Sequence, residues 1–186
     1  MTLILTIANR HGVHQSSDYQ LTNSKTREFH SDEPGSKQLE GTFGHLQILL
    51  AFTGVAIGFD RRRTIDWLSD ELTKLGSSPT NLEIICDALA KRCSAEIGSK
   101  GGLTLVLTVG EVERPFRVVR ISNSGFATEP SKREFRREIR VVRKPFYLIS
   151  GYREAVQAEQ RHQLNALSRN LSKSPAETQD ELARST

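Results

Sequence analysis

The amino-acid sequence predicts an α+β fold in which sheets and helices stack in layers. Strand patterns come in blocks separated by a pair of helix patterns, unlike the regular strand-helix alternation of α/β proteins. The first strand pattern, residues 3–8, is largely apolar on both faces, which fits two sheets packed face to face with helices outside. The length of 186 residues predicts a single domain, residues 1–186.

The chain opens with a predicted hairpin. After the first strand, Asn9–Gly12 supplies turn residues, with Gly12 able to take a positive φ, and a second strand follows over Val13–Ser17. Residues 23–44 are polar and contain glycine, so we expect a structured excursion too long for a simple turn. The apolar run His45–Gly54 then predicts a buried strand.

Two helices are predicted next. An apolar stripe begins after Thr64 and ends at Gly76, and a capping box over Thr80–Glu83 opens a second helix that ends at Gly98. Cys86 and Cys93 lie two turns apart on one face of that second helix. Their spacing favours buried thiols over a disulfide or a metal site.

Strands return after the helices, over residues 103–110, 116–123 and 138–151, the last broken by Pro145. A long helix is expected over residues 152–171. A further capping box with Pro175 at its first helical position starts a helix that has barely begun at Thr186. We therefore expect the C-terminal part of the domain to be short or missing.

Charge and hydropathy narrow the classes of function. The net charge of +4 comes mainly from Arg61–Arg63 and from Lys132–Lys144, where glutamates interleave with the basic residues. A solvated strand face explains the second stretch better than nucleic-acid binding, because aromatic stacking platforms are missing. No apolar run reaches the roughly 20 residues of a membrane helix, and no signal-peptide pattern opens the chain, so a cytoplasmic location is expected.

The N-terminal block resembles a known family. Thr2 on a first strand, the turn "RHGV" and Asp18 in "SSDYQLT" resemble the opening of proteasome β-type subunits and their bacterial relatives, which are N-terminal-nucleophile (Ntn) hydrolases. The spacing from Thr2 to Asp18 matches without a gap. The resemblance implies a four-layer α-β-β-α sandwich, a peptide or protein substrate, and assembly of identical subunits into rings or stacked rings.

The same resemblance assigns further site residues. Lys37 in "GSKQLE" stands where the family has its active-site lysine, although the preceding loop is longer here and Lys25 competes for the role. Gly54 matches the glycine whose backbone N–H helps to form the oxyanion hole, and Ser150 in "FYLISG" matches an accessory serine. No cofactor and no metal are implied, and a regulatory ATPase partner cannot be identified.

The implied chemistry is acyl transfer to Thr2. Once Met1 is removed, the α-amine of Thr2 can accept the proton of its own hydroxyl, so that one residue supplies both nucleophile and base. The Lys37 ammonium would lower the proton affinity of both groups, Asp18 would keep that lysine charged and oriented, and Gly54 would donate to the oxyanion.

Alternatives remain at each position. Thr2 could simply begin a strand, Asp18 could stabilise a turn, and Gly54 could close a strand. The chain has Gln20 where the family usually has arginine, and the mechanism requires the loss of Met1. The rival functions are a non-catalytic scaffold of the same fold, an amidase acting on small substrates, and a basic-surface binding module.

Overall fold

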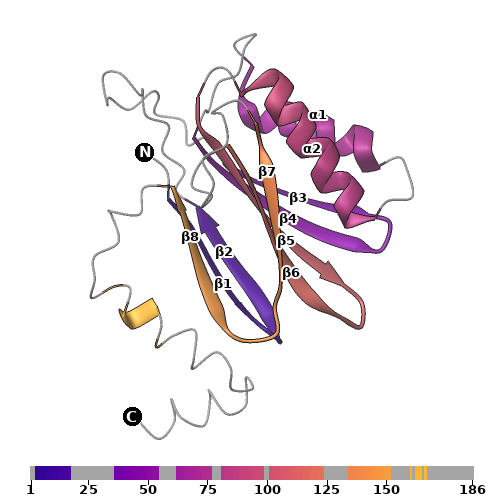
Figure 1. Cartoon of the computed structure of the whole chain (residues 1–186). Helices are drawn as coiled ribbons and strands as arrows, with labels where there is room; N and C mark the ends of the chain where they lie inside the picture. Colours follow the sequence, from indigo (N-terminus) through magenta and orange to yellow (C-terminus); the bar gives the residue numbers. More distant parts are fainter. Residues whose placement is uncertain are drawn as a thin grey trace, which may run out of the picture.

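The computed structural model describes residues 3–17, 36–54, 62–76, 81–98, 101–123 and 134–151, together with residues 160, 162–164 and 166. Along the chain these residues form the elements β1 (Leu3–Asn9), β2 (Gly12–Ser17), β3 (Gln38–Phe43), β4 (Leu46–Gly54), α1 (Thr64–Gly76), α2 (Leu82–Glu96), β5 (Leu103–Glu111), β6 (Arg114–Ser122), β7 (Arg136–Val141) and β8 (Phe146–Gly151). The strands form two antiparallel sheets, of order β2-β1-β8 and β3-β4-β5-β6-β7 (Figure 1).

The predicted hairpin is confirmed over its described part, residues 3–17. Strands β1 and β2 pair from Ile4 opposite Ser17 to Asn9 opposite Gly12. The Asn9 side chain closes the turn, because its Oδ1 accepts from the backbone N–H groups of His11 at 2.7 Å and Gly12 at 2.9 Å. Gly12 does not use its freedom to take a positive φ, because the Asn9 side chain holds the turn.

Strand β3 lies inside residues 23–44, for which a structured excursion is expected. It pairs with β4 from Gln38 opposite Ala51 to Phe43 opposite Leu46. Its polar residues and Gly41 hide the strand pattern, whereas pairing with the apolar β4 satisfies its backbone. The expected structured excursion therefore contains, over residues 38–43, a strand that the sequence pattern does not predict.

The expected strand over residues 138–151 is two strands in two different sheets. Strand β7 pairs with β6 at one edge of the five-stranded sheet, whereas β8 pairs with β1. Pro145 lies in the link between them, and the Val142 N–H donates to the carbonyl of Phe116 at 2.8 Å just before the chain crosses over. The proline therefore separates two strands instead of interrupting one.

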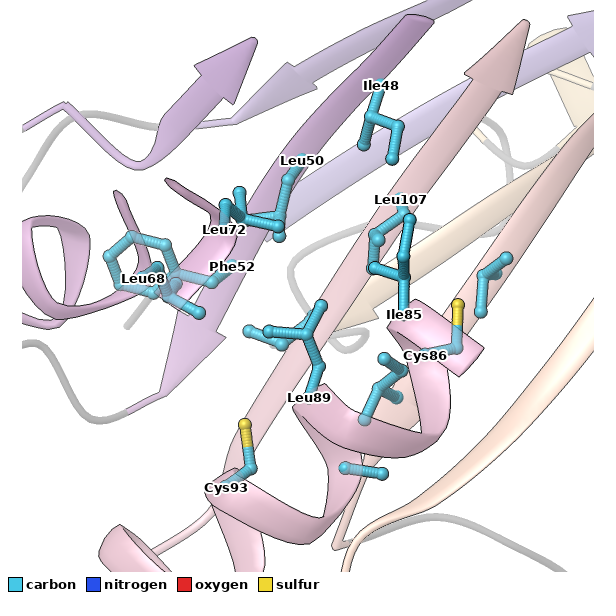
Figure 2. Packing of buried hydrophobic residues seen from close by; sticks show 14 of the residues in the cluster. Ile48, Leu50, Phe52, Leu68, Leu72, Ile85, Cys86, Leu89, Cys93 and Leu107 are labelled. Carbon is cyan, nitrogen blue, oxygen red and sulfur yellow. The ribbon is translucent and has the colours of Figure 1, made fainter. Parts of the chain in front are cut away.

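Helices α1 and α2 cover one face of the five-stranded sheet (Figure 1). Figure 2 shows their apolar side chains meeting those of β4 and β5 in one core; its labelled members are Ile48, Leu50, Phe52, Leu68, Leu72, Ile85, Cys86, Leu89, Cys93 and Leu107. Helix α2 begins one residue later than the Thr80 box implies, because Asn81 is its N-cap and accepts from the N–H of Glu83 at 2.9 Å. Both cysteines are buried and free, as predicted.

The three-stranded sheet packs on the other face of the five-stranded sheet. A second apolar cluster fills the space between the sheets and consists of Ile4, Ala8, Ala51, Val106, Val118 and Val142, with Val13, Phe116, Phe146 and Leu148 against it. The described elements thus stack as helices, large sheet and small sheet. The helix expected at 152–171 is described at five residues, all helical, and the one expected from Pro175 lies outside the described residues.

The basic stretch near β7 is a solvated strand face over its described part, residues 134–144. Arg136, Glu138 and Arg140 are exposed on this edge strand, and Arg140 pairs with Glu138 at 3.3 Å. Arg137 instead pairs with Asp87 of α2. In the described part of the chain no helix is long and apolar enough to cross a membrane.

Candidate active site

The described neighbours of Thr2 and Asp18 meet at one end of the strands of the small sheet. Thr2 and Asp18 themselves lie outside the described residues. Strand β1 starts with Leu3 opposite Gly151, and its next residue, Ile4, lies between Ser17 on one side and Ser150 on the other. The residues that flank the predicted nucleophile Thr2 and the predicted aspartate Asp18 therefore lie on adjacent strands. The predicted accessory serine, Ser150, lies on the third strand at the same level.

Ser150 lies on the face of β8 that points between the sheets. Leu148 and Phe146, two and four residues before it, pack against the inter-sheet cluster. Ser150 is 3% exposed, and its Oγ has no hydrogen-bond partner in the described part of the chain. A buried hydroxyl without a partner carries a desolvation cost, which is typical of functional groups.

Strand β8 faces β6 across the layer between the two sheets and runs in the same direction. Ser150, near the end of β8, therefore lies toward the end of β6. The Arg140 guanidinium carbon lies over the Phe146 ring, 5.1 Å from the ring centroid. Arg140 is the register partner of Val118. Leu148 lines a small hollow together with Arg120. Two residues further along the two strands come Ser150 and Ser122, so both serines lie toward the same end of the inter-sheet layer.

Lys37 is buried at the start of β3. It is 2% exposed, although the composition of its segment is typical of a solvated loop. Its carbonyl accepts from the N–H of Phe52 at 3.1 Å, which fixes its backbone beside the end of β4. A buried ammonium is costly unless it is paired, so burial at this place favours a specific role for Lys37 over that of a surface lysine. Lys25, its competitor, lies outside the described residues.

Gly54 ends β4 in a conformation that favours glycine. Its φ is 116°, and a Cβ built on it would overlap the carbonyl oxygen of Gly102. Gly54 is the register partner of Leu103, whose N–H donates to the Asn123 side chain and so points away from β4. In an antiparallel ladder Gly54 then points its N–H away from β5, to the side on which Phe52 meets Lys37.

Lys37, Gly54 and Ser150 therefore gather toward one end of the two sheets. Gly54 and Lys37 flank the end of β4, and Ser150 lies toward the end of β6, whose Ser122 is opposite Thr104 next to Leu103.

A buried polar network at the same end was not expected from the sequence. Thr104 Oγ1 and Ser122 Oγ are 2.7 Å apart, and Asn123 holds both the N–H of Leu103 at 3.1 Å and the carbonyl of Gly101 at 2.9 Å. Thr104, Ser122 and Asn123 are all buried. The available signal was the pair Gly101-Gly102 before one strand and Ser122-Asn123 at the end of the next.

Two carboxylates among the described residues, Glu71 and Glu111, serve the fold. Glu71 is buried between Lys74 and Arg92, 2.8 Å from each, and so ties α1 to α2. His45 and two arginines surround Glu111, where β4 begins and β5 ends. His14 is the register partner of Ile7, which lies on the opposite face of β1 from Ile4, so His14 points away from the layer between the sheets. Within the residues described, no group of three His, Cys, Asp or Glu side chains could hold a metal ion.

Comparisons with known proteins yield a structural likeness. No family model matches the chain, and no curated protein matches it in sequence. A solved structure, Anbu (ancestral beta-subunit) from Yersinia bercovieri, matches with a TM-score of 0.52 at 13% identity, covering 91% of this chain and 74% of that chain. At this identity the likeness bears on the fold alone, and it supports a proteasome-like fold for the chain.

Proposed function

We propose that the chain is a threonine-type N-terminal-nucleophile hydrolase that cleaves peptide or other amide bonds. The observation that carries the proposal is the burial of Lys37 beside the end of β4, where Gly54 directs its N–H to the same side. A lysine in a polar segment is ordinarily exposed, and the resemblance of the first 18 residues supplies a nucleophile for it to serve. The structural likeness to an ancestral beta-subunit is consistent with this class of fold.

The proposed mechanism uses the free amine of Thr2. After removal of Met1, this amine takes the proton from Thr2 Oγ as the oxygen bonds to the substrate carbonyl carbon. The N–H of Gly54 donates to the oxyanion, the carbon–nitrogen bond breaks, and the amine product leaves with the transferred proton. Water then hydrolyses the ester on Thr2. Lys37, oriented by Asp18, supplies positive charge beside the nucleophile, and Ser150 supplies a hydroxyl.

The proposal extends to the architecture and assembly. The helix expected over residues 152–171 would cover the small sheet and complete a four-layer α-β-β-α sandwich within one domain. Identical subunits would then associate through their helices into rings in the cytoplasm. Substrate choice would follow from the pocket around Gly54 and from access to the ring interior.

Two measurements test the hydrolase. The intact mass of the purified protein must correspond to the chain without Met1, because a blocked amine cannot act as the base. A β-lactone should then add covalently to wild-type protein and not to Thr2→Ala. Lys37→Met should lose most of the labelling, whereas Lys25→Met, the matched control, should keep it. Retained Met1, or equal labelling of Thr2→Ala, would contradict the proposal and favour the non-catalytic scaffold.

The second candidate is an amidase that acts on small substrates through the same residues. A panel of fluorogenic peptides and short N-acyl amides separates the two candidates. Hydrolysis confined to the small amides would identify the amidase.

A further inference from the structure

Asn123 clamps the start of β5 on the side opposite Gly54. Its Oδ1 accepts from the N–H of Leu103 at 3.1 Å, and its Nδ2 donates to the carbonyl of Gly101 at 2.9 Å. Asn123 is 5% exposed, so the two bonds are shielded from water. One side chain therefore fixes the backbone on both sides of Gly102.

The clamped segment is the one that abuts Gly54. The carbonyl oxygen of Gly102 fills the space of a Cβ on Gly54, and Leu103 is the register partner of Gly54. Because neither glycine has a side chain between the two backbones, a shift of Gly102 is passed directly to the peptide of Gly54.

The bond to Asn123 shows which way the ladder faces at its end. The Leu103 N–H that Asn123 Oδ1 accepts points away from β4, so Thr53 with Thr104 is the last hydrogen-bonded pair before Gly54. The hydroxyl pair of Thr104 and Ser122, 2.7 Å apart, adds a second link between β5 and β6 at the same level. The N–H of Gly54 therefore points away from β5.

We propose that Asn123 is a positioning residue for the oxyanion donor: by holding Gly101 and Leu103 it sets the position and direction of the Gly54 N–H. This inference rests on the proposed function, in which that N–H meets the developing negative charge. Misplacing such a donor slows the steps that form an oxyanion, and complete loss commonly costs about 100- to 1,000-fold in rate.

Two electrophiles distinguish this role from a merely structural one. A β-lactone acylates Thr2 Oγ through a tetrahedral oxyanion, with the ring C–O bond breaking and the proton passing to the released alkoxide. A peptide vinyl sulfone adds Oγ to its β-carbon and the proton to its α-carbon, without forming a carbonyl oxyanion. In Asn123→Ala we expect acylation to slow by about 10- to 100-fold, while vinyl sulfone addition changes by less than about threefold because no donor to an oxyanion is needed.

The variants are chosen to keep the test decisive. Asn123→Asp keeps an acceptor for the Leu103 N–H but sets a carboxylate oxygen against the carbonyl of Gly101, so it should slow acylation at least as much as Asn123→Ala. Val119→Ala, a buried change four residues before Asn123 at a side chain that forms no hydrogen bond to Gly101 or Leu103, controls for general destabilisation and should leave the ratio of the two rates unchanged. Hydrogen exchange at Thr53 and Thr104 should quicken in both Asn123 variants, relative to the amides of α1 and α2, and not in Val119→Ala.

The outcomes separate the two proposals. Full acylation by the Asn123 variants, or equal slowing with both electrophiles, would overturn the role of Asn123 while leaving the hydrolase intact. Unchanged exchange at Thr53 and Thr104 would overturn it as well. Wild-type protein that reacts with neither electrophile would overturn the hydrolase, and the catalytic role of Asn123 with it.

Discussion

The carbonyl oxygen of Gly102 occupies the space in which a side chain on Gly54 would begin. The φ of 116° at Gly54 adds a second reason for glycine, because other residues are strained there. The end of β4 therefore depends on the absence of one carbon atom.

We expect Gly54→Ala to lower the free energy of unfolding by at least about 2–3 kcal/mol, since both strain and overlap must be relieved by moving β5. Urea unfolding followed by circular dichroism measures the change. Gly12→Ala is the control: no atom lies within 4 Å of its Cβ position and its φ is not positive, so it should stay within about 0.5 kcal/mol of wild type. Equal losses in the two variants would show that the close approach to Gly102 does not constrain Gly54.

Ser150→Ala should separate stability from activity. The Ser150 hydroxyl is buried with no partner among the described residues, so its removal should leave the free energy of unfolding unchanged or raise it by about 1 kcal/mol. If the hydroxyl serves Thr2, amide hydrolysis should fall by about tenfold, the value of one hydrogen bond of about 1.4 kcal/mol. Thr108→Val removes another buried hydroxyl without a described partner and should leave hydrolysis unchanged. A loss of stability in Ser150→Ala without a loss of activity would argue for a structural serine.

The sequence pattern predicts the helices and strands whose own residues carry a clear apolar signal. The apolar stripes of α1 and α2 and the apolar runs of β4 and β5 have clear periods, and the structure confirms them. It does not predict β3, whose residues are polar and which exists because β4 lies beside it. It also does not predict the separation of β7 from β8, because β8 finds its partner in β1, at the other end of the described chain.

The candidate site shows the same division. Gly54 and Ser150 are singled out by the family resemblance, and both lie at the ends of strands that the pattern predicts. The burial of Lys37 depends on elements distant in the chain, and composition alone favours exposure. Asn123 is at the end of an ordinary strand, and its two bonds to Gly101 and Leu103 depend on how β5 and β6 align.

The two thiols should be inert in the folded protein. Burial raises the pKa of Cys86 and the pKa of Cys93 to about 12, so both are protonated at neutral pH. A thiol-reactive disulfide reagent should therefore label neither cysteine at pH 8 in native protein and both in unfolding concentrations of urea. Rapid labelling of native protein would contradict the burial of either side chain.

The raised pKa of each thiol also makes the fold sensitive to alkali. Above pH 8.5 the unfolded chain loses the thiol protons that the folded chain keeps, so the free energy of unfolding should fall by about 1.4 kcal/mol per pH unit for each cysteine, up to about pH 12. Cys86→Ala should have a shallower slope than wild type between pH 9 and 10, whatever its stability at pH 7. An identical slope would show that Cys86 is not buried as a neutral thiol.

The ion pair between Asp87 of α2 and Arg137 of β7 should act at the opposite end of the pH range. Hydrogen bonding to Arg137 lowers the pKa of Asp87, so this carboxyl binds a proton more weakly in the folded protein than in the unfolded chain. A depressed folded pKa contributes stability above the unfolded value of about 3.9, and that contribution is lost as the pH falls through the folded pKa. Because Asp87 is exposed, the effect is small and should weaken in salt.

Asp87→Asn should therefore be less stable than wild type at pH 6 in low salt, and the difference should shrink toward pH 2 as the wild-type carboxyl takes up its proton. Midpoints of urea unfolding at the two pH values measure both quantities. Arg137→Met should lose the same increment at pH 6, and the double variant should lose no more than the larger single loss, because one interaction is removed in all three proteins. Additive losses at pH 6, or a difference that persists unchanged at pH 2, would show that the two side chains stabilise the fold through separate contacts and that α2 is not held to the edge strand by this pair.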